Sequence, residues 1–358
     1  MANFKHFIRP TSEKPPSLVS VTIVSALVGL ATGAAGFSLL RALYPSETII
    51  TGTTGDLSSL KVTFDEPLTA VAAQLDDHIV PVYNHIETST TNLYTDRDYV
   101  ATALIVTSDG WLMVPSTVSV PAQPDVIVNN KVYRVTEQHL DTVAQVRFLK
   151  IDANNLSPIR FTKDDEVKQG ALLVYEQARI AGGSLFNRSL VRQIDTIDMT
   201  SRMTQIHGAS LVDQTIAIDQ NASESVFYFT AGGAVAGVGQ GGQLVPAYYI
   251  RTAVDKLLAK TSYVSLGISY VDLYRLPGHQ DDEGVLITSG LRAAIIPGSP
   301  AAKAGLKLND HIVAVAGTPI GYTNNNSLGK LMLGYKTGDS VVLDIVRDGK
   351  KQQVTVQF

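Results

Sequence analysis

Two serines on either side of an acidic residue carry hydroxyl groups that could act as nucleophiles if a base lay beside them. Ser223 and Ser225 flank Glu224. A serine nucleophile needs an imidazole that takes its proton and a carboxylate that holds the imidazole. None of the 7 histidines forms a recognisable motif with these serines; they are His6, His78, His85, His139, His207, His279 and His311. No lysine lies near either serine in sequence, so a Ser–Lys dyad has no evident partner either.

Three further motifs have residue types that bind cofactors or metals elsewhere. Gly237 to Gly242 satisfies G-x-G-x-x-G, but no βαβ unit follows it, as a dinucleotide site would require. Asp76-Asp77-His78 and Asp281-Asp282-Glu283 place acidic residues and a histidine at adjacent positions. Neighbouring side chains in a strand point to opposite faces, so this spacing fits solvated loops better than a metal site. We therefore expect no cofactor and no metal.

The composition is that of a folded chain without affinity for nucleic acid. With 358 residues, and about 150 residues per domain, two domains are expected. Apolar residues make up 45% and charged residues 17%, which is unlike a disordered chain. A net charge of −4 and the lack of a long basic run argue against phosphate binding. The absence of cysteine excludes disulfides, thiolate zinc sites and cysteine nucleophiles.

The N-terminal part predicts a transmembrane helix over residues 17–40. No charge occurs from Pro15 to Leu40, and about 20 residues suffice to cross the hydrocarbon core. The alternative is a cleaved signal peptide, whose apolar region is only roughly 7–15 residues long, although Ala31 to Ala35 resembles a cleavage site. Basic residues lie mostly before the segment, which predicts a cytoplasmic tail over residues 1–16; they are Lys5, Arg9 and Lys14, against Arg41 after it. Residues 41–65, rich in Thr, Ser and Gly, are expected to be a linker.

The next two hundred residues or so predict an all-β domain closed by a helix. Short runs of Val, Ile, Tyr and Thr are broken by turn residues, as at Ala101 to Val106 and Ala171 to Tyr175. Many short strands at this spacing are typical of a barrel or sandwich. From Ala247 to Lys260 the period becomes helical, with Tyr249, Ala253, Leu257 and Leu258 near one face.

The last hundred residues predict a separate α+β unit. Ser299 and Pro300 can cap and begin a short helix that ends at Gly305, and Leu308 to Val315 then reads as a strand. Asp348-Gly349 predicts a tight turn between two strands, Val341 to Val346 and Val354 to Phe358. In the second of these strands, Val354, Val356 and Phe358 fall on one face.

This C-terminal unit resembles the PDZ domains attached to HtrA and Deg proteases. The resemblance rests on Ile296 to Gly317 and on the loop Ser265-Leu266-Gly267-Ile268, which is similar to the carboxylate-binding loop of PDZ domains. It implies a PDZ domain over residues 262–358 that binds C-terminal or extended peptide segments through backbone N–H groups and strand addition. It also implies that Leu266 and Ile268 line the pocket for the last side chain, with Leu331 as a further wall. A bulky residue at Gly267 is then expected to obstruct the carboxylate.

The preceding residues resemble an HtrA-type, trypsin-like protease domain, which implies a double barrel over residues 66–260. The matching segments are Leu68 to Tyr83, Ser108 to Val118, Gln145 to Asp152 and Leu244 to Leu258. The resemblance puts Thr117 at the position of the catalytic histidine, Gln145 at that of the aspartate and Glu224 at that of the serine. It also makes the glycines from Gly237 to Gly242 a turn between strands.

These patterns lead to one main hypothesis and two rivals. The main hypothesis is a single-pass protein of a bacterial cell membrane, with most of the chain outside the cytoplasm. It combines a degenerate protease domain with a peptide-binding PDZ domain and acts as a scaffold, regulator or quality-control binder. The resemblance also implies a homotrimer. The first rival is an active endopeptidase with a displaced site near Ser223 or Ser225, and the second is a structural membrane tether.

Overall fold

The computed structural model describes the chain from residue 66 onward, with short gaps. The described ranges are residues 66–87, 93–163, 166–180, 183–194, 211–212, 214–219, 225–276, 283–290, 293–321 and 326–358. They belong to one compact unit, Thr63–Phe358. The predicted cytoplasmic tail, transmembrane helix and linker lie outside these ranges. Within them, no helix is both long and apolar enough to cross a membrane.

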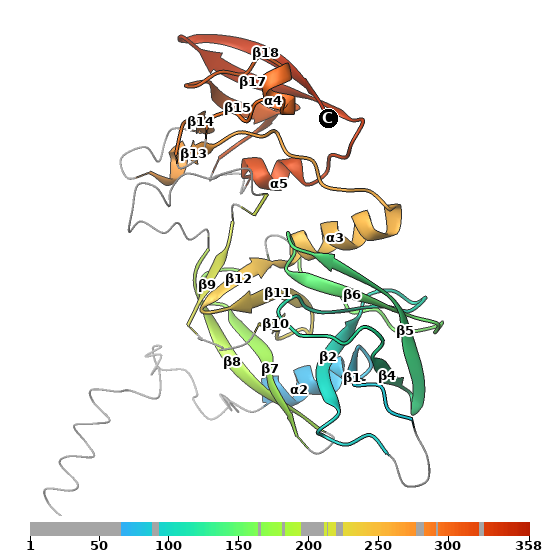
Figure 1. Ribbon diagram of the computed structural model, residues 1–358. Coiled ribbons are helices and arrows are strands. Elements are labelled where there is room, and N and C mark those ends of the chain that lie inside the picture. Colours follow the sequence, from blue (N-terminus) through green and yellow to red (C-terminus); the bar gives the residue numbers. More distant parts are fainter. Residues whose placement is uncertain are drawn as a thin grey trace, which may run out of the picture. The chain divides into compact units, whose positions relative to one another are not determined.

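Six strands form a first closed barrel, drawn from light blue to green in Figure 1. Around the barrel they follow the order β1-β2-β3-β6-β5-β4. Alternate side chains of these strands fill the interior, as at Val80, Val82, Leu112 and Val114, because successive residues in a strand face opposite sides. The strands are β1 (Ile79–Tyr83), β2 (Tyr99–Ile105), β3 (Trp111–Pro115), β4 (Asp125–Val128), β5 (Lys131–Asp141) and β6 (Val146–Ile151).

Six further strands close a second barrel in the order β10-β11-β12-β9-β8-β7. They are β7 (Leu172–Ile180), β8 (Gly183–Ile194), β9 (Ile216–Ile218), β10 (Val226–Thr230), β11 (Val235–Gln240) and β12 (Gln243–Pro246). The expected turn over Gly237 to Gly242 is wrong for most of its length, because Gly237 and Gly239 lie inside β11. A Cβ atom on Gly237 would approach the carbonyl oxygen of Val245 to 2.2 Å, so this glycine allows two strands to pack closely. Only Gly241 and Gly242 turn the chain, with φ of +62° and +81°.

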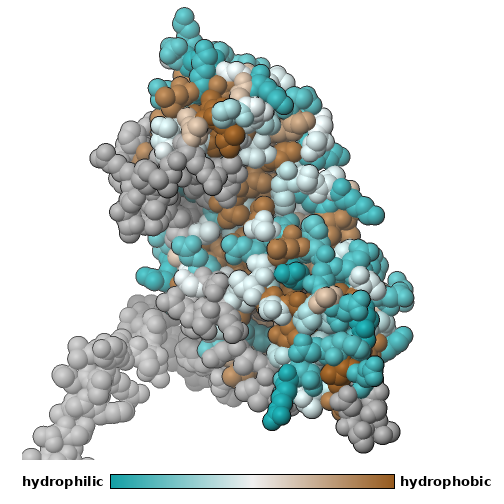
Figure 2. All heavy atoms as spheres, viewed as in Figure 1, coloured by the Kyte–Doolittle hydropathy of each residue, from teal (hydrophilic) through white to brown (hydrophobic). Residues whose placement is uncertain are grey.

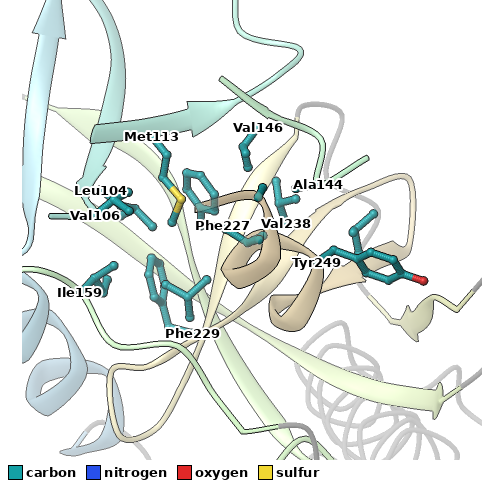
Figure 3. Packing of buried hydrophobic residues seen from close by; sticks show 14 of the residues in the cluster. Leu104, Val106, Met113, Ala144, Val146, Ile159, Phe227, Phe229, Val238 and Tyr249 are labelled. Carbon is teal, nitrogen blue, oxygen red and sulfur yellow. The ribbon is translucent and has the colours of Figure 1, made fainter. Parts of the chain in front are cut away.

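The two barrels share an apolar core with two helices, α2 (Glu66–Leu75) and α3 (Ala247–Ala259). Figure 3 shows Leu104 and Met113 of the first barrel near Phe227 and Phe229 of the second. Tyr249 of α3 is fully buried in the same core. The helix predicted from Ala247 to Lys260 is thus confirmed, but Leu258 is 51% exposed and does not share the buried face. The barrels are therefore held together by one continuous core.

The C-terminal residues form a separate sheet with two short helices, drawn from orange to red in Figure 1. The main path of the sheet runs β13-β14-β15-β17-β18, and β16 pairs with β15. The strands are β13 (Tyr270–Asp272), β14 (Val285–Ile287), β15 (His311–Val315), β16 (Thr318–Pro319), β17 (Ser340–Arg347) and β18 (Lys350–Gln357). The helical segments are η2 (Leu273–Arg275), α4 (Pro300–Lys303) and α5 (Leu328–Met332).

Local signals in this sheet domain are confirmed, with one exception. The Ser299 hydroxyl accepts a hydrogen bond from the N–H of Ala302 at 3.2 Å and so caps α4, with Pro300 at its start. Asp348 and Gly349 have φ of +50° and +71°, as a tight hairpin turn requires. The exception is Leu308, which is 52% exposed and precedes β15 instead of belonging to it.

Large apolar side chains that reach the surface come from many different elements. Hydrophobic residues accordingly appear in several separate areas of the face shown in Figure 2, among hydrophilic ones. The exposed large apolar residues within the described ranges are Leu93, Val132, Leu140, Leu172, Leu185, Leu190, Leu258, Ile296, Leu308 and Val342.

Candidate functional site

The end of β3 and the start of β6 bring together two of the three segments that were expected to correspond to the catalytic triad. Pro115 at the end of β3 pairs with Val146 at the start of β6. The N–H of Ser116 donates to the carbonyl oxygen of Gln145 at 2.9 Å. Thr117 and Gln145 therefore lie at neighbouring strand ends, and both are exposed. A hydroxyl and an amide at these places cannot act as a base or as an ion partner for one near neutral pH.

Ser225 lies in a cleft between the barrels. The cleft has a volume of about 150 Å³. Pro115 and Val118, which flank Ser116 and Thr117 in the sequence, also line it. Ser225 directly precedes β10 and is only 5% exposed. Ser223 and Glu224 lie outside the described residues. Residues next to Thr117 and residues next to the expected nucleophile therefore line the same cleft.

No histidine is among the described residues that line this cleft. The Nδ1 atom of His78 lies 2.9 Å from the carbonyl oxygen of Ser157, and that of His85 lies 2.7 Å from Asp125 Oδ2. His139 is exposed on β5, and His311 belongs to the C-terminal sheet. His6, His207 and His279 lie outside the described ranges. The described part of the cleft therefore offers no imidazole to activate Ser225.

A buried carboxylate in the first barrel was not predicted from the sequence. Asp125 is 1% exposed, and its Oδ2 accepts a hydrogen bond from the Tyr94 hydroxyl at 2.6 Å. Arg134 Nε donates to its Oδ1 at 2.6 Å, and His85 contacts it as described above. Burial would raise the pKa of Asp125, but these hydrogen bonds together with the charge of Arg134 outweigh it and lower the pKa.

This cluster fastens His85 and Tyr94 to the barrel. Burial, the hydrogen bond to Asp125 and its negative charge raise the pKa of Tyr94 to about 12. The Tyr94 ring packs against Tyr83 with centroids 5.2 Å apart, and Tyr83 contacts Tyr99, which lines the cleft. The four polar members lie far apart in sequence, at positions 85, 94, 125 and 134, so no local pattern could reveal them.

The second candidate site is the loop before β13. Gly267 has a φ of +75°, and its carbonyl oxygen accepts from the N–H of Ile296 at 2.8 Å. The carbonyl oxygen of Leu266 accepts from Ala301 at 3.0 Å. Both of these carbonyl groups are thus used inside the domain, unlike two of the loop's N–H groups. Those of Leu266 and Ile268 form no hydrogen bond with another described residue, and that of Gly267 donates to the Ser265 hydroxyl at 3.2 Å.

The structure brings the five predicted peptide-binding residues of this site into one region. Leu266 and Ile268 are 4% and 3% exposed and belong to the core of the C-terminal domain. Leu331, in α5, is half-buried and packs against the same core. β13, which continues from the loop, is the edge strand of the sheet and pairs with β14 alone among the described strands. An edge strand, a loop with N–H groups to offer and an apolar helix are the parts that strand-adding peptide sites use.

Comparison with known proteins agrees with this architecture. Residues 264–358 match the family model of the PDZ domain. The chain is 26% identical over 272 residues to the "Probable periplasmic serine endoprotease DegP-like" of Pseudomonas putida, covering 70% of this chain and 54% of that protein. It is 31% identical over 130 residues to the "Serine protease Do-like HtrA" of Bacillus subtilis, covering 33% and 28%. The chain thus spans about half, or less, of the length of these curated relatives.

Solved structures share the same fold. "HtrA-type protease AlgW with decapeptide" superposes with a TM-score of 0.54 at 14% identity, covering 83% of this chain and 98% of that one. "HtrA-type protease AlgW with tripeptide" gives 0.55 at 14% identity, covering 81% and 95%. The fold is therefore that of HtrA-type proteases, two six-stranded barrels followed by a PDZ domain. The sequence relatives are serine proteases of the DegP-like and HtrA kinds, to which the chain is similar at 26–31% identity.

Proposed function

We propose that this chain is a membrane-anchored HtrA-like protein that captures peptide segments in its PDZ domain. The single observation that carries the proposal is the loop Ser265 to Ile268. The carbonyl groups of Leu266 and Gly267 are engaged within the domain, whereas the N–H groups of Leu266 and Ile268 have no partner among the described residues. Successive N–H groups of this kind attract anions such as a terminal carboxylate.

The geometry supports a definite binding mode. The carboxylate would accept hydrogen bonds from Leu266 and Ile268, and it would replace the Ser265 hydroxyl as the partner of the Gly267 N–H. The peptide main chain would pair with β13, the last strand of the described sheet, and its last side chain would lie between the loop and α5, near Leu331. The structures of AlgW with a decapeptide and a tripeptide are peptide complexes of the same fold, which supports this mode by analogy.

In the same proposal the barrels do not hydrolyse peptides. Thr117 and Gln145 occupy the strand ends where the resemblance expects a base and its carboxylate, and no described histidine lines the cleft. The alternative, a displaced endopeptidase site at Ser223 or Ser225, has one observation in its favour, since Ser225 does line the cleft. Its hydroxyl would still need a proton acceptor, which the described cleft does not contain.

The membrane part of the proposal rests on residues 17–40 and on the relatives. One relative is described by name as periplasmic, which supports placing the barrels and the PDZ domain outside the cytoplasm. The full chain should sediment with membranes, and protease added from outside should digest the residues after Arg41. Recovery of a soluble mature chain beginning near Ala35 would contradict the anchor.

Calorimetric titration of the full chain with paired peptides tests the PDZ site. A peptide with a free apolar C-terminal residue should bind more tightly than the same peptide amidated, because amidation removes the charge on the acceptor. A hydrogen bond to a charged group contributes about 1.5–3 kcal/mol, which corresponds to a roughly 10- to 150-fold change in Kd.

Two variants complete this test. Leu331→Ala should weaken binding of both peptides, whereas Leu140→Ala, at an exposed position on β5, serves as the matched control and should change neither. Equal affinity for the free and amidated peptides would contradict carboxylate capture and leave strand addition to β13 as the only binding mode.

A further inference from the structure

A single carboxylate stands out among the residues that line the inter-barrel cleft. Glu176 of β7 is the one charged side chain among the described lining residues. Most of the wall around it is apolar; it includes Leu104, Pro115, Val118, Phe186, Val226 and Phe227. Tyr99, Thr102 and Ser225 add hydroxyl groups. The cleft is therefore an apolar slot with one acidic group in its wall.

Glu176 is only partly satisfied inside the protein. Its Oε1 accepts a hydrogen bond from the Ser184 hydroxyl at 2.5 Å. No ion pair joins it to any basic residue whose side chain the structure describes. A half-buried carboxylate loses solvation, and a neutral hydroxyl replaces only part of it. A cation that enters the cleft would supply the missing interaction.

The surroundings favour a cation and disfavour an anion. No lysine or arginine lines the cleft among the described residues. At about 150 Å³, against about 30 Å³ for each water molecule in the liquid, the cleft has room for a side chain of several heavy atoms.

We propose that the inter-barrel cleft binds a basic side chain of an extended peptide, lysine above all, with Glu176 as the specificity-determining residue. The aliphatic stem would lie against Phe186, Val226 and Phe227, and the ammonium group would reach the Glu176 carboxylate. Glu176 and Phe186 are cross-strand partners in the β7–β8 pair, so one pair of strands presents both the carboxylate and an apolar wall. The barrels would thus be a second peptide receptor that holds a chain without cleaving it.

This site is independent of the PDZ groove, and the experiment keeps the two apart. The probes are Gly-Val-Lys-Val-Gly peptides that are acetylated at the N-terminus and amidated at the C-terminus, so no terminal charge can enter either site. The matched probe has norleucine in place of lysine, which keeps the stem and removes the charge. Both are titrated into the full chain by calorimetry at low and high salt.

The lysine peptide should bind at least about tenfold more tightly than the norleucine peptide, and this difference should shrink at high salt. Glu176→Gln should abolish the difference, whereas Glu137→Gln, an exposed control on β5 outside the cleft, should keep it. Equal affinity of the two peptides for the unmodified chain, or no binding of either at 1 mM (about −4 kcal/mol), overturns the proposal. A preference that survives Glu176→Gln overturns the role of Glu176.

The two binding proposals can fail separately. If a peptide with a free apolar C-terminus binds while the lysine peptide does not, only the proposal for the inter-barrel cleft fails. If the lysine peptide binds while the peptide with the free apolar C-terminus does not, only the PDZ proposal fails.

Discussion

Gly267→Ala is expected to destabilise the PDZ domain by about 2–5 kcal/mol, for two separable reasons. Gly267 has a φ of +75°, a conformation that costs a residue with a Cβ roughly 1–2 kcal/mol. A Cβ built there would lie 2.4 Å from Ser299 Cβ and 2.9 Å from Ser299 Oγ. Overpacking of this kind typically costs about 1–3 kcal/mol, because backbone or side chains must move.

The domain contains a matched control. Gly305 has nearly the same φ, +76°, but a Cβ on it would meet nothing within 4 Å. Gly305→Ala should therefore cost only the conformational part, about 1–2 kcal/mol. The difference between the two variants isolates the contact with Ser299.

A second substitution tests the contact directly. Ser299→Gly alone should cost a few tenths of a kcal/mol, because glycine replaces a serine N-cap with little loss. Combined with Gly267→Ala it should restore about 1–3 kcal/mol, the steric part. Hydrogen–deuterium exchange of the amides in β17 and β18 measures the free energy of opening of this domain within the full chain. Equal costs for Gly267→Ala and Gly305→Ala, or no recovery in the double variant, would refute this account.

The contact between a Cβ at position 267 and Ser299 also affects how peptide binding by Gly267 variants can be interpreted. The expectation that a bulky residue at Gly267 blocks the carboxylate is incomplete, since the first atoms such a residue meets belong to Ser299. A loss of peptide binding in Gly267→Val would therefore report a displaced loop as readily as an obstructed site. Amidation of the peptide leaves the protein unchanged and is the cleaner test.

Two further predictions concern the barrels. The purified full chain should not digest casein and should not react with a fluorophosphonate, because no described histidine accompanies Ser225; activity that Ser225→Ala or Ser223→Ala abolishes would establish the displaced protease instead. The pKa of Asp125 is lowered in the folded state, so its ionised carboxylate stabilises the first barrel above the ordinary aspartate pKa of about 4. This contribution to the free energy of unfolding should be lost as the pH falls through the lowered pKa. Thermal unfolding between pH 2 and 7 should show a weaker acid dependence for Asp125→Asn, and parallel curves for both proteins would contradict this.

The parts of the fold predicted correctly from sequence are those that depend on neighbouring residues. The cap at Ser299 and the hairpin turn at Asp348-Gly349 need only a few adjacent residues, and the structure confirms both. The alternation of Val354, Val356 and Phe358 on one face depends only on the period of a strand, and these residues pack toward the core of the C-terminal domain. The two barrels and the PDZ domain were predicted through resemblance. The barrels close through pairing between strands that lie far apart in the sequence, which a local pattern cannot show.

What sequence reasoning missed depends on contacts between distant residues. Asp125 gathers partners from β5 and from the segment that leads to β2, and Glu176 is noticeable only because the two barrels enclose it in an apolar cleft. Gly237 was expected to belong to a turn. Its close approach to Val245 exists only because β11 pairs with β12, and the sequence does not show that pairing. The exposure of Leu258 has a similar origin, because the shared core extends over only part of α3.

The shared core has a consequence for the order in which the chain can fold as it is made. All strands of the first barrel lie before residue 152, so that barrel can close while the second is still being synthesised. Part of its apolar surface, however, is covered by β10 and α3, which begin at Val226 and Ala247; this surface includes Leu104, Met113 and Phe148. A nascent chain that stalls between these points carries an uncovered apolar face next to a finished barrel. Such an exposed face is prone to aggregation, whereas the buried core of the PDZ domain comes from contiguous sequence.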